Sequence, residues 1–114
     1  MTGHADVEAY LSKTFSTNPA DTTVDKWCTD CDALITQMGS GLSTTIKTFL
    51  AVQGAIELYK QYKKWVLNAG ADATGDKDGA FTYNVVDLIQ FLKKMILALE
   101  TCGDHVTIEI PGNT

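Results

Sequence analysis

The chain has 114 residues, a length typical of one domain over residues 1–114 that can bury a core without help from a metal or a disulfide. Its 14 acidic residues outnumber its 9 basic residues, which gives a formal net charge of −5 and counts against binding to nucleic acid or to an anionic membrane. Every basic residue is a lysine, so the chain lacks the guanidinium group that usually binds phosphate or guanine through two hydrogen bonds.

Helical periodicity dominates the chain and predicts an all-α fold, which we expect to be a compact bundle of four or five helices with a short extended C-terminal tail. The first helix is expected over residues 6–15, where apolar side chains recur on one side. It should end before Pro19, because proline disfavours the helical conformation of the residue that precedes it. His4 precedes this helix and is expected to lie in a mobile N-terminal segment.

The second helix has a clean amphipathic pattern. We expect it to begin at an N-cap within residues 21–23 and to end near Met38. Its apolar stripe contains Val24, Trp27, Cys28, Cys31, Leu34, Ile35 and Met38. A turn at residues 39–41 should follow, because two glycines inside a helix would cost about 2 kcal/mol relative to alanine. The alternative is one unbroken helix, since the apolar residues from Leu42 onward continue the same stripe in phase.

Residues 43–68 are predicted to form a third helix whose apolar side changes direction near Gly54. Such a helix either kinks at the change or lies between two different neighbours. A loop rich in glycine, alanine and aspartate should follow over residues 68–79. Residues 74–82 have the inner acids and the glycine of an EF-hand calcium loop but lack its outer carboxylates, so we expect no tight calcium site.

The last helix is expected to start near Thr82 or Asn84 and to end at Thr101, because a glycine follows shortly afterwards. It is unusually apolar, and Val86 and Leu97 lie on the side of the helix that is otherwise polar. In so small a chain, such a helix is either wrapped completely by the other helices or partly covered by another molecule.

The C-terminal segment alternates apolar and polar residues from His105 to Ile110, which suggests one strand. A single strand needs a partner, and residues 79–83 could supply it across the last helix. Otherwise the segment adds to a sheet in another protein or docks on the bundle as an extended tail.

The cysteines lie in two short clusters, a C-x2-C motif at Cys28 and Cys31 and a C-x2-H motif at Cys102 and His105. Three thiolates and one imidazole are a ligand set for a closed, structural zinc site, so zinc held by these four residues is one hypothesis. The bland alternative, which we favour, is buried free thiols, because Cys28 and Cys31 lie on an apolar stripe. A disulfide or a redox pair is the third possibility.

Cysteine usage also bears on the compartment. The chain has 3 cysteines, an odd number, and it has no basic start followed by an apolar run of the kind found in secretory signals. Both features favour a reducing, cytoplasmic setting over a disulfide framework. Charged and polar residues interrupt the longest apolar stretch, residues 85–99, so we expect no membrane span.

No arrangement of residues in the sequence indicates an enzyme. The chain has no phosphate-binding glycine loop, and no nucleophile or zinc-protease motif occurs in it. We therefore expect a small non-enzymatic protein that binds protein partners and forms homo-oligomers through its last helix. The predicted interface residues are Val86 and Leu97 of that helix and Trp65 of the third helix.

Two other functions remain open at this stage. One is a metal- or redox-responsive regulator that uses the cysteine and histidine clusters. The other is a carrier of a small apolar ligand, whose ordinary alternative is a filled core. Its cavity would be lined by Trp27, Met38, Tyr59, Trp65, Phe91 and Met95.

Overall fold

The computed structural model describes residues 2–16, 19–38, 41–69 and 81–106, except for the side chains of residue 69 and residues 100–106. These ranges contain four α-helices: α1 (His4–Leu11), α2 (Asp21–Met38), α3 (Thr44–Ala69) and α5 (Val85–Val106). The predicted all-α fold is confirmed, and no strand occurs within the same ranges. None of these helices combines the length and the apolar character needed to cross a membrane.

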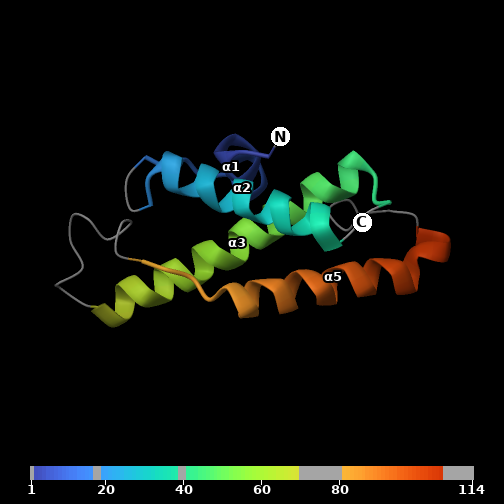
Figure 1. Ribbon diagram of the computed structural model, residues 1–114. Helices are drawn as coiled ribbons and strands as arrows, with labels where there is room; N and C mark the ends of the chain where they lie inside the picture. Colours follow the sequence, from blue (N-terminus) through green and yellow to red (C-terminus); the bar gives the residue numbers. More distant parts are fainter. Residues whose placement is uncertain (1, 17–18, 39–40, 70–80, 107–114) are drawn as a thin grey trace.

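Helix α3 is the centre of the bundle (Figure 1). Helix α2 packs along one side of it and α5 along another, and both run antiparallel to α3. The short α1 contacts both α2 and α3, and it lies on the side of α2 that is remote from α5. Because α2 and α5 contact each other less than either contacts α3, α5 is covered mainly on the side that faces α3.

Gly54 explains how α3 carries two neighbours at once. A Cβ atom added at Gly54 would lie 2.7 Å from Sγ of Cys31 in α2 and 3.3 Å from a methyl carbon of Leu92 in α5. The three helices therefore meet at a point where only glycine leaves enough room. Since α3 is helical throughout Thr44–Ala69, the change of apolar side reflects two neighbours and no interruption of the helix.

The predicted break between the second and third helices is confirmed. Helix α2 ends at Met38, and Gly41 has a φ of +101°, a backbone conformation that favours glycine. Helix α3 is then capped by Ser43, whose hydroxyl oxygen accepts a hydrogen bond of 3.2 Å from the amide of Ile46. One unbroken helix through residues 39–41 is therefore excluded.

The starts of α1 and α2 and the end of α1 differ from the predictions. Helix α1 begins two residues earlier and ends four residues earlier than residues 6–15 imply. Ser12 adopts a left-handed conformation with a φ of 55°, and this turn lets Phe15 be buried outside the helix. Helix α2 begins directly after Ala20, whose backbone carbonyl accepts the first helical hydrogen bonds, so residues 21–23 lie inside the helix instead of capping it.

The predicted start of the last helix is confirmed, but its predicted end is wrong. The side-chain oxygen of Asn84 accepts a hydrogen bond of 3.0 Å from the amide of Asp87, which makes Asn84 the N-cap of α5. The helix continues past Thr101 and through Gly103 to Val106. A glycine inside a helix costs only about 1 kcal/mol, so one glycine is a weak stop signal.

The strand predicted for the C-terminal segment is wrong for its first two residues, because His105 and Val106 belong to α5. Residues 107–110 lie outside the described residues, as do residues 74–80 of the acidic loop. Phe81 and Tyr83 alternate in the sequence, yet they form no strand. Their contacts, described below, attach the start of α5 to the other helices.

Candidate functional site

Cys28 and Cys31, the first half of the predicted zinc site, lie together in the core of the bundle. Both are free thiols with no exposed surface, and Sγ of Cys31 packs against Gly54. Burial is the main cause that raises the pKa of each thiol to about 12, and neighbouring negative charges add to it. At neutral pH both groups are therefore protonated, and protonated thiols are poor nucleophiles and poor metal ligands.

Cys102 and His105, the second half of that site, lie in the last turns of α5, where the side chains are outside the description. Leu92 is the α5 residue that meets Gly54 beside Cys31, and Cys102 follows it by ten residues. At 1.5 Å per residue, the backbone of Cys102 is about 15 Å further along the helix. Among the described residues, no group of three or more possible ligands could hold a metal ion. The zinc site stays a prediction.

Trp65, one of the predicted interface residues, is half-buried in an aromatic cluster. Its ring lies 5.7 Å from Phe81 and 6.0 Å from Tyr62, measured between ring centroids. Phe81 also lies 6.0 Å from Trp27 and 5.4 Å from Tyr62. These spacings are those of rings in direct contact, so the cluster fills space that the apolar-ligand hypothesis had assigned to a cavity. The ligand carrier stays a prediction, with Trp27 and Trp65 packed against protein side chains.

Tyr83 provides the second attachment of the segment that leads into α5. Its hydroxyl donates a hydrogen bond of 2.5 Å to a carboxylate oxygen of Asp30 in α2. Burial and this hydrogen bond raise the pKa of Tyr83, so the phenol is a hydrogen-bond donor across the physiological range. With Phe81 held by three rings, these contacts fix the position at which α5 begins.

The N-terminal segment is anchored on α2, so the expectation that His4 is mobile is wrong. The amide of Thr2 donates to Asp32 at 3.2 Å, and the amide of His4 donates to Asp25 at 2.7 Å. Nδ1 of His4 lies 2.8 Å from the same Asp25 oxygen, and Nε2 lies 4.0 Å from Asp21. The hydrogen bond to Asp25 raises the pKa of His4, and the backbone amide of His4 lowers the pKa of Asp25.

This N-terminal anchor had a signal in the sequence. Asp21, Asp25 and Asp32 are spaced by four and seven residues, so they lie along one side of α2. Because Asp25 and Asp32 bind the N-terminal segment, the contacts of His4 have a structural role.

Helix α5 carries an exposed row of residues that we call the outer stripe: Val86, Gln90, Lys93 and Leu97. They are spaced by four, three and four residues and therefore lie on one side of the helix. Val86 is 61% exposed and Leu97 is 62% exposed, whereas Leu88 and Leu92 on the inner side are fully buried. The two predicted interface residues of α5 thus lie at the two ends of one exposed row.

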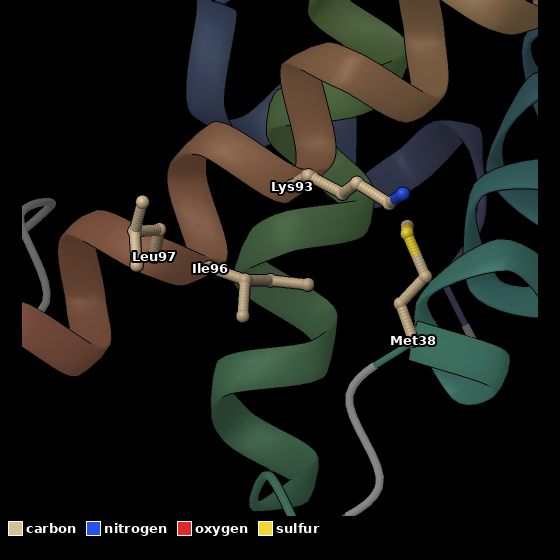
Figure 2. Close-up of a pocket in the computed structure, with 4 residues that line it drawn as sticks. All are labelled: Met38, Lys93, Ile96 and Leu97. Atoms are coloured by element: carbon tan, nitrogen blue, oxygen red, sulfur yellow. The ribbon is translucent and has the colours of Figure 1, made fainter.

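An open groove lies beside the C-terminal half of the outer stripe. It has a volume of about 380 Å³ and is lined by Met38, Lys93, Ile96 and Leu97. Figure 2 shows that the Lys93 side chain extends toward Met38, while Leu97 points away from Met38. The sequence interpretation assigned Met38 to the core and missed this groove. The available signal was that Met38 is the last residue of its helix, where the covered stripe ends.

Comparisons with protein-family models, with curated proteins and with solved structures found no significant match to this chain. Function is therefore inferred from the residues alone. The described part of the chain offers a buried thiol pair, an anchored histidine, and an exposed apolar row beside an open groove. Of these, the thiols are fully buried, and the His4 side chain is 32% exposed but bound to Asp25. The row and groove on α5 are open to another molecule.

Proposed function

We propose that the protein is a small, non-enzymatic assembly protein that associates with copies of itself through the outer stripe of α5. The observation that carries this proposal is the exposure of Val86 and Leu97 on one side of α5, at 61% and 62%. Val86 and Leu97 lie at the two ends of the stripe with Gln90 and Lys93 between them, and exposed apolar side chains beside an open groove suit a surface that another protein covers.

The distribution of exposed apolar residues supports the choice of α5. Five large hydrophobic residues in the described part of the chain are strongly exposed: Tyr10, Leu67, Val85, Val86 and Leu97. Three of them lie on α5, whereas Tyr10 and Leu67 lie singly on α1 and at the end of α3. The stripe is short, so we expect a small interface and a weak dimer whose population depends on concentration.

The state of the titratable groups agrees with a binding protein that is not an enzyme. Cys28 and Cys31 are buried with raised pKa values, and His4 is bound to Asp25. The two buried thiols lack the accessible, ionised form that nucleophilic catalysis requires, and His4 takes part in the contacts that anchor the N-terminal segment. Unpaired cysteines also suit the reducing cytoplasm, which we propose as the compartment.

Sedimentation velocity at increasing protein concentration tests the proposal. We expect the wild-type protein to shift from monomer toward dimer as its concentration rises, and we expect Leu97→Glu to keep it monomeric. Leu67→Glu is the matched control, because Leu67 is 79% exposed but lies at the far end of α3. A wild-type protein that stays monomeric at every concentration would contradict the proposal, as would an equal effect of the two substitutions.

A further inference from the structure

We propose that two copies of the chain pair through α5 in antiparallel orientation, with Val86 of one copy packed against Leu97 of the other. The proposal rests on the self-association proposed above and adds the orientation of the partner. A two-fold axis would pass between residues 91 and 92, which lie midway between Val86 and Leu97 in the sequence.

The outer stripe has the symmetry that such a pair needs. Its order is apolar, polar, polar, apolar, and Gln90 and Lys93 are equally distant from the midpoint. Antiparallel pairing about this midpoint therefore places an apolar side chain opposite an apolar side chain at both ends. It also places the polar Gln90 opposite the polar position 93 of the second copy, so no apolar side chain at the centre of the pair faces a polar one.

Two charged residues beside the stripe decide between antiparallel and parallel pairing. Asp87 and Lys94 are exposed and lie along the same edge of the stripe, because they are spaced by seven residues. In the antiparallel pair, Lys94 of the second copy lies opposite Ile89, only about 3 Å along the axis from Asp87. In a parallel pair the two-fold axis runs along the helices, so the edge that carries Asp87 and Lys94 lies on opposite sides of the interface in the two copies, and these residues form no charge pairs. The opposite charges of Asp87 and Lys94 thus favour the antiparallel pair.

Lys93 does not oppose this arrangement. Its side chain extends along the other edge of the stripe toward Met38 of its own chain (Figure 2). A cation at the C-terminal end of α2 is also favoured by the helix dipole. The groove beside Leu97 lies next to the place that Val86 of the second copy would take, so the open space is located where the pair needs it.

Cross-linking between single-cysteine variants tests the orientation. Val86→Cys and Leu97→Cys would each be made in a Cys102→Ser background, and a short bis-maleimide would be added to each variant alone and to their mixture. Cys28 and Cys31 can stay, because they are buried and their raised pKa values keep them protonated. We expect a cross-linked heterodimer in the mixture, identified by its mass, and little cross-linking of either variant alone.

A charge exchange gives a second, independent measurement. Asp87→Lys and Lys94→Asp should each weaken the dimer by about two- to ten-fold in its dissociation constant, because two exposed charge pairs are lost per dimer. The double variant Asp87→Lys with Lys94→Asp should restore the wild-type dissociation constant, since antiparallel pairing then rebuilds both pairs.

The outcomes separate this inference from the proposed function. A heterodimer in the mixture and rescue by the double variant support antiparallel pairing. Cross-linking of each variant with itself, without rescue, overturns antiparallel pairing but leaves self-association through α5 intact. A wild-type protein that stays monomeric overturns both.

Discussion

Two regions of the molecule differ in how their apolar residues are covered: the contact of α2, α3 and α5 at Gly54, which we call the crossing, and the outer stripe of α5. At the crossing, Cys31 and Leu92 approach Gly54 so closely that no Cβ atom fits between them. On the outer stripe, Val86 and Leu97 keep more than half of their surface in water. The apolar side chains at the crossing are covered entirely by the chain itself, whereas those on the outer stripe are covered on only one side.

This difference shows where the fold's stability and its interactions reside. Burial of apolar surface at the crossing contributes to folding of the single chain, because every atom there has neighbours. The exposed part of Val86 and Leu97 contributes nothing to folding of the single chain, and it can contribute only when another molecule covers it. The following predictions test this separation, in decreasing order of expected effect.

The two leucines on opposite sides of α5 give the largest contrast. Leu92→Ala removes a fully buried side chain at the crossing and should lower the free energy of unfolding by about 2–5 kcal/mol. Leu97→Ala removes a side chain that is 62% exposed and should change the free energy of unfolding by less than about 0.5 kcal/mol. Urea denaturation at low protein concentration, where the monomer dominates, measures both values. Similar losses for the two variants would refute the separation.

Gly54→Ala should destabilise the protein by about 1–3 kcal/mol, although alanine is the better helix former. The added methyl group would lie 2.7 Å from Sγ of Cys31, and the buried thiol has little room to rotate away. The companion variant with Gly54→Ala and Cys31→Ala should be more stable than the sum of the two single changes predicts, because the clashing sulfur is gone. Additive effects in a urea-denaturation cycle would show that the helices can move apart.

Tyr83→Phe should lower the free energy of unfolding by about 1–2 kcal/mol, because Asp30 loses the hydroxyl that donates to its carboxylate. The matched control is Tyr10→Phe. The Tyr10 side chain is 51% exposed, so water can take the place of its hydroxyl group and loss of that group should cost little stability. Thermal unfolding of both variants against the wild type measures the difference. Equal melting temperatures for the two variants would mean that Tyr83 does not hold the start of α5.

The anchor between His4 and Asp25 should make the docking of α1 depend on pH. The pKa of His4 is raised from 6.5, so its contribution is complete below 6.5 and is lost as the pH rises through the raised pKa. The pKa of Asp25 is lowered from 3.8, so its contribution is present above 3.8 and is lost as the pH falls through the lowered pKa. The anchor should be strongest between these values.

The matching measurement compares the urea midpoints of the wild type and His4→Gln at several pH values. We expect the difference to be largest between pH 3.8 and 6.5 and to shrink above this window. His105 is present in both proteins, so its titration cancels in the difference. A difference that is constant with pH would show that only the backbone hydrogen bond of His4 matters.

Much of the fold could be predicted from the sequence, because a helix has a local sequence pattern. The stripe of α2, the glycine turn after Met38 and the cap at Asn84 are all short-range signals, and the structure confirms them. The change of side at Gly54 predicted either a kink or two neighbours, and the structure shows two neighbours. It could not reveal which side chains meet there, because that depends on contacts between residues far apart in the chain.

Most of the features that sequence reasoning missed are long-range contacts. The carboxylates of α2 bind the amides of Thr2 and His4, and no local pattern near His4 announces these partners. The end of α5 was misjudged because a single glycine shifts the helix equilibrium too little to stop it. Val86 and Leu97 were predicted to be surface residues from the helical wheel alone, and their exposure is confirmed. Their role in an interface stays a proposal.

The hydrogen bonds of the α2 carboxylates have a consequence for the use of the chain's negative charge. Asp25 and Asp32 accept hydrogen bonds from backbone amides, and Asp30 accepts one from Tyr83. These hydrogen bonds fasten the N-terminal segment and the segment before α5 to α2. The backbone amides and the phenol are neutral donors, so the bonds leave the negative charge of the surface in place. The acidic composition, with its formal net charge of −5, thus serves internal fastening as well as solubility.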